Sequence, residues 1–193
     1  MRQHLNTAVN ITILATLGVL LFSPSGPATS WIRGWQDARN ARSLVKKLWP
    51  QLIAAPSALG STTNDPRHVI EFIDYQCPSC ASIADQLKEN AQRTGARIII
   101  RHYPLPGHVH APMAARAAIC GEEDQAFDDF HHALLAVDWS QVGNQVDWRK
   151  IAERAGIKEL DRFELCLSSD ATRQRLAQDQ GFAQLLGVRG TPT

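Results

Sequence analysis

The stretch IEFIDYQCPSCASIADQLKEN, residues 70–90, decides the fold because it begins as a strand and ends as a helix. His68–Tyr75 is a nearly continuous apolar run rich in β-forming residues, which is typical of a strand buried on both faces. The proline after the first cysteine suits the first position of a helix, and apolar residues on one face extend that helix to about residue 93. Cys77 and Cys80 therefore stand where a strand becomes a helix.

A second strand and a long helical region follow this helix. The sequence ARIIIRHYPL at 96–105 contains three consecutive isoleucines and predicts a strand. A strand, a helix and a strand at this spacing form a βαβ unit, so the two strands should be parallel. From Ala111 onward the pattern is helix after helix with short breaks.

Three chemistries compete for the two cysteines. Structural zinc usually needs four ligands, commonly two such pairs, whereas Cys120 and Cys166 each stand alone. His108 and His110 are a lone pair near a loop, and such pairs are more often solvated. A purely structural disulfide between Cys77 and Cys80 would close a very small loop and remove little chain entropy.

Redox chemistry fits the local physics better. Cys77 stands near the N-cap of the helix, where free backbone N–H groups and the helix dipole favour a thiolate and lower the pKa. A thiolate can attack a disulfide and is also a good leaving group. Cys80 lies one turn further into the helix and can resolve the mixed disulfide by attacking Cys77. A CxxC motif beside a βαβ pattern is a known redox signature.

The N-terminus bears on the compartment. Ala8–Phe22 is uncharged and follows Arg2, which fits a signal peptide with cleavage after Ser30; the alternative is an uncleaved signal anchor. We expect export in either case. The segment 31–52 predicts a basic helix that either lies at a membrane interface or packs its tryptophans on the domain. The formal net charge of +1 gives no reason to expect a nucleic-acid partner.

The chain resembles a known family at two separated motifs. VIEFIDYQCPSC at 69–80 is similar to the active-site strand and helix start of DsbA-like thioredoxin-fold thiol–disulfide oxidoreductases, and GVRGTPT at 187–193 to the segment with their cis-proline. The helical stretch 111–169 resembles the helical domain that these proteins insert. The resemblance covers about residues 67–193 and is closest to the bacterial, often membrane-anchored branch.

The resemblance implies an α/β fold, a thioredoxin fold with an inserted all-helical domain. It also implies that the family's closing strands and final helix are missing from this chain, which then looks truncated. We expect the following organisation: signal peptide or anchor with linker (1–30), N-terminal helix and loop (31–66), first half of the thioredoxin fold (67–110), helical insertion (111–169), and a helix with the cis-proline segment (170–193).

Individual roles follow from the resemblance. Cys77 matches the nucleophile and Cys80 the resolving cysteine. Pro192 matches the cis-proline and Thr191 the residue before it, in a segment that contacts the substrate chain. Glu71 matches a buried acid that assists proton transfer, and a carboxyl in an apolar strand should have a raised pKa; the alternative is a glutamate at an exposed strand end.

Cys120 and Cys166 lie 46 positions apart in the helical region. In an oxidising compartment they could pair and tie two helices together. The alternatives are two buried free thiols or, least favoured, a second redox relay, because neither cysteine has a CxxC at a helix start.

We therefore expect an extracytoplasmic thiol–disulfide oxidoreductase that acts on cysteines of exported proteins and needs no metal or organic cofactor. A membrane or soluble redox partner would recycle it. Ser79 stands where the best-known members have histidine, which weakens the expected oxidising power and leaves oxidation, reduction and isomerisation open. The competing class is a non-enzymatic binding module that holds partners by its cis-proline groove.

Overall fold

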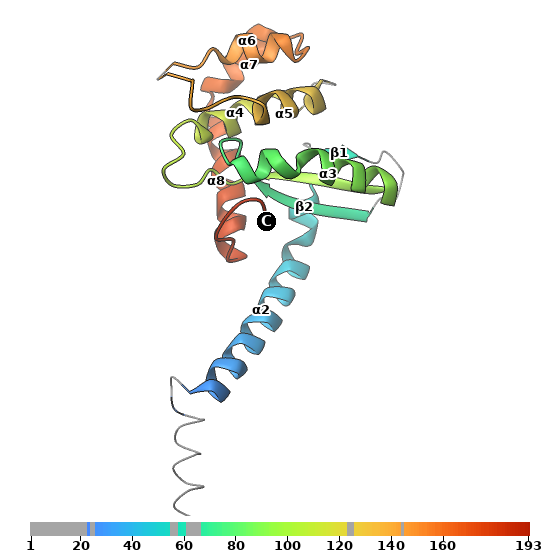
Figure 1. Ribbon diagram of the computed structural model, residues 1–193, viewed down its shortest axis with the longest axis vertical. Helices are drawn as coiled ribbons and strands as arrows, with labels where there is room; N and C mark the ends of the chain where they lie inside the picture. Colours follow the sequence, from blue (N-terminus) through green and yellow to red (C-terminus); the bar gives the residue numbers. More distant parts are fainter. Residues whose placement is uncertain (1–22, 24–25, 55–57, 61–66, 123–125, 144) are drawn as a thin grey trace, which may run out of the picture. The chain divides into compact units, whose positions relative to one another are not determined.

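The computed structural model describes residues 23, 26–54, 58–60, 67–122, 126–143 and 145–193, with the backbone alone for 31–38 (Figure 1). The uncharged segment that we interpret as part of a signal peptide or signal anchor, which ends at Phe22, lies outside the described residues. Among the described helices, none is long and apolar enough to span a bilayer. The chain forms two compact units, Met1–Leu48 and Trp49–Thr193. The division of the chain into five segments stays a prediction.

The first unit contains most of helix α2, Pro27–Ile53. The helix begins inside the Pro/Ser/Gly-rich segment that composition marks as a linker. Proline is compatible with a helix start because its missing N–H would have no intrahelical partner there. Near that start, the hydroxyl of Thr29 donates to Gly26 O at 2.8 Å and so satisfies a backbone carbonyl of the first turn.

In the part of the second unit that the structure describes, the strands form a three-stranded sheet. Its strands are β1 (Ala58–Gly60), β2 (Arg67–Ile73) and β3 (Ala96–His102), in the order β1-β3-β2. β2 and β3 are parallel, in a register that pairs Ile70 with Ile99, so the predicted βαβ unit is confirmed. β1 is antiparallel to β3 and lies in a segment that the sequence predicts as loop.

Gly60 explains why β1 can lie so close to β3. Its φ is +93°, a conformation that side chains with a Cβ rarely adopt. A Cβ at this position would also lie 2.8 Å from the backbone oxygen of Ala96. Glycine is therefore required where β1 ends.

Helix α3, Pro78–Thr94, connects the two parallel strands. Cys77 is its N-cap residue, with φ −83° and ψ 118°, and Gly95 ends it in the left-handed conformation. The helix predicted from Pro78 to about Arg93 is confirmed. The arrangement fixes the two cysteines at the carboxyl end of β2, where the first turn of α3 begins.

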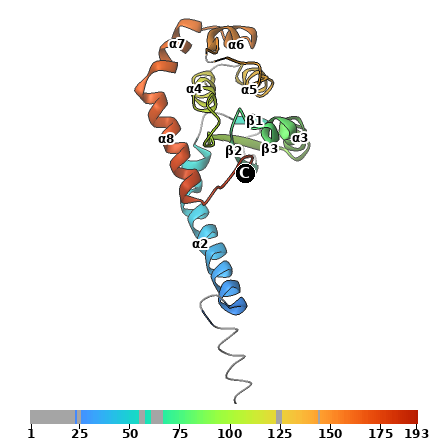
Figure 2. The ribbon, with the colours of Figure 1, turned by 60° about the vertical axis from the view of Figure 1, so that its left-hand side comes forward.

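In the described residues after β3, the chain forms five further helices. They are α4 (Ala111–Gly121), α5 (Phe127–Leu135), α6 (Trp148–Arg154), α7 (Leu160–Ser168) and α8 (Asp170–Leu185). Figures 1 and 2 show α4–α7 gathered together, with α8 running from them back to the sheet. Most of the buried apolar residues of the described helices and strands form one cluster, in which Phe130 meets Phe163 edge to face.

A buried ion pair holds α8 against β3. Arg101 Nη1 lies 2.7 Å from Asp179 Oδ1, and the two side chains are 2% and 0% exposed. Arg101 also donates to the carbonyl of Leu52, and its guanidinium lies over the ring of Phe182. Because a buried charge is costly without a partner, these contacts fix the packing of α8 on the sheet.

Candidate active site

The site is built around Cys77 and Cys80, which are both free thiols. Cys77 is 7% exposed and its backbone N–H donates to Asp74 O at 3.1 Å. Cys80, one turn into α3, is fully buried. A reagent from solution therefore reaches Cys77 more readily than Cys80.

The environment of Cys77 favours its thiolate. Burial raises the pKa of this thiol, but hydrogen bonds from Thr191 and from the backbone N–H groups of the first helical turn together hold it below its ordinary value. In the thiol form, Cys77 Sγ donates to the carbonyl of Thr191 at 3.4 Å. The Thr191 hydroxyl is buried without another hydrogen-bond partner among the described residues, so it can donate to the thiolate.

Cys80 has the opposite electrostatic character. Burial raises the pKa of its thiol to about 12, so Cys80 holds its proton at neutral pH. The two thiols of one motif thus differ in protonation: the pKa of Cys77 is lowered, which suits a nucleophile, whereas Cys80 stays protonated. When the pKa values of two neighbouring groups are shifted in opposite directions, the two groups are expected to have different chemical roles.

The segment Thr191–Thr193 reaches the site from the far end of the chain. The Thr191–Pro192 peptide bond is cis. Thr193 exchanges two backbone hydrogen bonds with Phe72 of β2, at 2.8 and 3.3 Å. This antiparallel pairing brings Thr191 beside Cys77, 114 positions away in the sequence.

Asp74 organises the loop next to the cysteines, and sequence reasoning missed it. Its carboxylate is fully buried and accepts from Gln76 N at 2.7 Å, Leu105 N at 2.7 Å and His108 Nδ1 at 2.8 Å. The expectation that His108 is merely solvated is therefore wrong. A carboxylate directly after a buried strand was the available signal, since a buried charge must find partners.

Aromatic residues surround Tyr75, which precedes the motif. Its O–H donates to His131 Nδ1 at 3.0 Å, and its carbonyl accepts from Trp139 Nε1 at 2.8 Å. Burial lowers the pKa of His131 to about 3, so this imidazole is neutral. His110 stacks on Trp139 with 5.6 Å between ring centroids. His131 is thus a buried packing residue.

Glu71 is 5% exposed, and burial raises the pKa of its carboxyl to about 7. Glu71 is therefore not a glutamate at an exposed strand end, which was the alternative for this residue. Burial first, and then the charges of Glu122, Glu71 and Cys80, raise the pKa of the Tyr75 phenol. Glu71 and Cys80 thus act electrostatically on the same buried side chain. A carboxyl that titrates near neutrality can accept or release a proton there.

The variant Glu71→Gln tests this burial. Folding raises the pKa of this carboxyl from 4.5 to about 7. Its contribution to the free energy of unfolding is therefore fully present below pH 4.5 and is lost as the pH rises through 7. Glutamine does not ionise. The variant should therefore gain stability over the wild type with rising pH, by up to about 3 kcal/mol above neutrality.

Denaturant titrations of both proteins on either side of this pH range measure the difference. The same substitution at Glu89, an exposed residue of α3, is the matched control. A gain at Glu71→Gln that does not change with pH would contradict the buried, titrating carboxyl.

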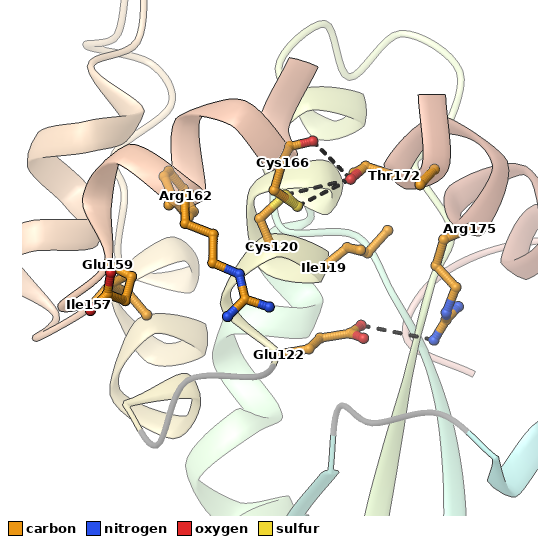
Figure 3. A pocket seen from close by; sticks show the side chains of 11 residues that line it. Ile119, Cys120, Glu122, Ile157, Glu159, Arg162, Cys166, Thr172 and Arg175 are labelled. Carbon is orange, nitrogen blue, oxygen red and sulfur yellow. Dashed lines mark hydrogen bonds and ion pairs between the residues drawn. A yellow bond between two sulfur atoms is a disulfide. The ribbon is translucent and has the colours of Figure 1, made fainter. Parts of the chain in front are cut away.

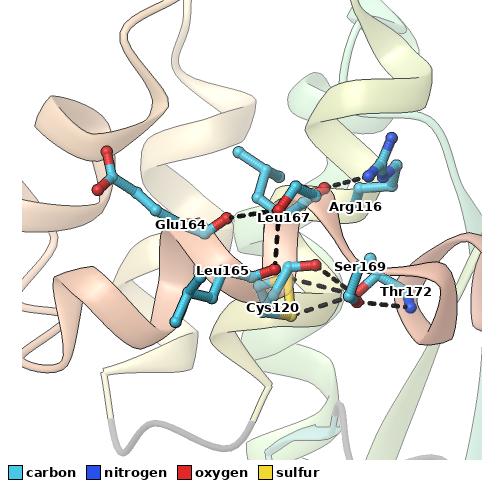
Figure 4. The surroundings of a disulfide bond; sticks show 9 residues. Arg116, Cys120, Glu164, Leu165, Leu167, Ser169 and Thr172 are labelled. Atoms are coloured by element: carbon cyan, nitrogen blue, oxygen red, sulfur yellow. Dashed lines mark hydrogen bonds between the residues drawn. A yellow bond between two sulfur atoms is a disulfide. The ribbon is translucent and has the colours of Figure 1, made fainter.

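The other two cysteines form a disulfide between α4 and α7. Cys120 and Cys166 are joined with an S–S distance of 2.05 Å and a Cα–Cα distance of 5.7 Å. Figure 4 shows the bond beside Thr172, at the start of α8. Among the described residues, no three His, Cys, Asp or Glu side chains converge in a way that would hold a metal ion.

Comparison with known proteins places this fold and site in a family. The family model described as Thioredoxin matches residues 56–193. The chain therefore belongs to the thioredoxin family. Its fold is that of the DsbA-like thiol–disulfide oxidoreductases, so the expected fold class is confirmed.

Two solved structures carry this likeness. The thiol-disulfide exchange protein α-DsbA2 from Wolbachia pipientis is 26% identical, with a TM-score of 0.67 over 81% of this chain and 84% of that one. A thioredoxin-like oxidoreductase from Silicibacter pomeroyi is 27% identical, with a TM-score of 0.59 over 70% and 76% of the two chains. A ScsC variant from Proteus mirabilis, 18% identical with a TM-score of 0.70 over 99% and 82%, shows the fold alone.

Curated relatives have a different name. A protein named Na(+)/H(+) antiporter NhaA 3, from Salinispora tropica, is 37% identical over 93% of this chain. NhaA 1 from Salinispora arenicola is 30% identical over the same share. The chain spans 29% of the length of each of these relatives.

Proposed function

We propose that this protein is a thiol–disulfide oxidoreductase whose working couple is Cys77–Cys80. One observation carries the proposal: two thiols at a single helix start have pKa values shifted in opposite directions, with Thr191 beside the one that ionises. A thiolate is the reactive form in disulfide exchange, and its stabilisation makes the oxidised form easier to reduce.

The cycle as an oxidase begins with the Cys77–Cys80 disulfide. A substrate thiolate attacks Cys77 Sγ, a mixed disulfide forms, and Cys80 leaves as a thiolate that takes up a proton. A second substrate thiolate then attacks the substrate sulfur of the mixed disulfide and releases Cys77 as a thiolate. The substrate loses two electrons and two protons; Cys80 takes up one proton, the other passes to solvent, and the motif is left reduced.

Two further groups support this cycle. The segment with Thr191 and Pro192 lies beside Cys77, and we propose that it holds the substrate chain by backbone pairing. Glu71 is the proposed proton carrier for Cys80, because a thiol with a pKa of about 12 needs a base to deprotonate it when it attacks and an acid to protonate it when it leaves. A carboxyl with a pKa of about 7 can serve at physiological pH.

We propose the oxidase direction and cysteine-containing exported proteins as substrates, with a membrane or soluble redox partner to recycle the dithiol. Reductase or isomerase activity is the alternative within the same fold. We also propose an extracytoplasmic location, which agrees with the uncharged segment Ala8–Phe22.

The antiporter name of the curated relatives calls for a separate proposal. The aligned region covers nearly all of this chain but only 29% of those proteins. We propose that the chain corresponds to a thioredoxin-type part of these relatives, and that their transport activity is not its own.

The redox potential of Cys77–Cys80 tests the direction. Equilibration of a Cys120→Ala/Cys166→Ala variant in glutathione buffers, followed by alkylation and mass spectrometry, isolates the one couple of interest. We expect a value above about −200 mV, between strongly oxidising members of the fold near −120 mV and reducing ones near −270 mV. A value near the reducing end would overturn the oxidase direction.

A further inference from the structure

A pocket in the helical part of the chain lies against the second disulfide. Its volume is about 420 Å³, which falls in the range of small-molecule sites. Cys120 from α4 and Cys166 from α7 both line it (Figure 3). The cystine is therefore not sealed in the core but faces a space that a small molecule can occupy.

Charges of both signs line this pocket. Arg162 and Glu159 are exposed residues at its rim. Arg175 and Glu122 lie deeper, with 3.8 Å between Arg175 Nη2 and Glu122 Oε1, and are held by further ion pairs to Asp179 and His102 respectively. Ile119, Ile157 and Phe163 supply apolar surface between them. A ligand that carries one positive and one negative group on a short skeleton is complementary to such a lining, whereas a singly charged ligand satisfies only half of it.

The sulfur atoms have a hydroxyl beside them. Thr172 Oγ1 lies 3.2 Å from Cys166 Sγ and 3.6 Å from Cys120 Sγ (Figure 4). Thr172 is the third residue of α8, whose N-cap is Ser169. Both cysteines lie near the C-termini of their helices, α4 and α7, where the helix dipole disfavours a thiolate. A thiolate here would instead be stabilised by the Thr172 hydroxyl, the N-terminus of α8 and the arginines of the pocket.

From these contacts we propose that the pocket binds a small zwitterionic thiol of the α-amino-acid type, which reduces the Cys120–Cys166 disulfide. The thiol's carboxylate pairs with Arg162 and its ammonium group with Glu159. The deeper charges already have partners, because Glu122 Oε1 lies 3.2 Å from His102 Nε2 and Arg175 pairs with Asp179. The inference assigns a second redox site and does not depend on Cys77–Cys80.

The exchange balances in two steps. The bound thiolate attacks Cys120 Sγ, and Cys166 leaves as a thiolate that then takes up a proton. The Thr172 hydroxyl, which donates to the carbonyl of Cys166 in this structure, can turn to donate to that thiolate. A second thiolate attacks the ligand sulfur of the mixed disulfide and releases Cys120 as a thiolate, which also takes up a proton. Two thiols become one disulfide, and the two protein sulfurs gain two electrons and two protons.

The test uses the full chain with Cys77 and Cys80 both changed to alanine, so that only one disulfide remains. Its reduction is followed by alkylation and mass spectrometry with L-cysteine, 3-mercaptopropionate, cysteamine and 2-mercaptoethanol. Each rate constant is divided by that of the same thiol with a small neutral disulfide, which removes intrinsic nucleophilicity. The normalised rate for L-cysteine should exceed the other three by about tenfold, as one charge-assisted hydrogen bond supplies.

Surface variants keep the test specific to the pocket. Arg162→Gln and Glu159→Gln should each remove most of the advantage of L-cysteine, and both residues are exposed, so folding is preserved. Arg154→Gln is the matched control, because this exposed arginine ends α6 and does not line the pocket. Equal normalised rates for all four thiols, or a disulfide that resists reduction until the chain unfolds, would overturn the proposal.

Discussion

Replacement of Cys77 with serine is expected to abolish thiol–disulfide exchange, with a loss of at least about a thousandfold in rate. A serine hydroxyl does not ionise at neutral pH and forms no disulfide. The helix start, Thr191 and the buried surroundings would all remain, so the loss isolates the sulfur itself. Insulin reduction and oxidation of a dithiol peptide measure the two directions of exchange.

The neighbouring positions sharpen this experiment. Ser79→Ala changes an exposed residue of the same helical turn and should retain exchange activity, because only the backbone N–H of residue 79 helps to lower the pKa of Cys77. Cys80→Ala should leave Cys77 trapped in mixed disulfides that non-reducing gels resolve. Full activity in cells after Cys77→Ser would favour a binding module over an enzyme.

Loss of the second disulfide is expected to destabilise the chain strongly. The Cys120–Cys166 bond closes a loop of 46 positions, and the chain-entropy model assigns about 4 kcal/mol to such a cross-link. Replacement of both cysteines with alanine should lower the free energy of unfolding by that amount. The bond ties α4 to α7, so the helical part should show the loss first in hydrogen exchange.

Guanidinium titrations of the double-alanine variant and the wild type provide the measurement. Comparison with the wild type after reduction and alkylation separates the cross-link from the substituted side chains. A decrease in the free energy of unfolding below about 1 kcal/mol would contradict this prediction. It would mean that the unfolded chain is already compact, so that the disulfide removes little of its conformational entropy.

Local features of this chain could be predicted from the sequence, because short stretches contain their causes. The apolar run before Cys77, the proline after it and the isoleucines of β3 specify a strand, a helix and a parallel strand. The helix start likewise indicates which cysteine ionises. β1 was missed because three residues carry no periodicity, and its place depends on the close approach of Gly60 to Ala96.

Features that depend on distant partners could not be predicted. Arg101 and Asp179 lie 78 positions apart, and nothing near either residue indicates the other. The same holds for Asp74 and His108, where loop closure decides the contact. The place of Thr191 beside Cys77 followed from resemblance to a family and not from any local pattern. The charged pocket at the second disulfide likewise arises only when α4, α7 and α8 meet.

The contacts between Phe72 and Thr193, and between Cys77 and Thr191, bear on when the chain becomes reactive. They join residues from opposite ends of the second unit, so their closure carries a large entropic cost and is expected late in folding. During synthesis, Cys77 emerges long before the threonine that favours its thiolate. We therefore expect Cys77 to react slowly in a growing chain and to reach its full nucleophilicity only after Thr191 has been synthesised and has packed beside it.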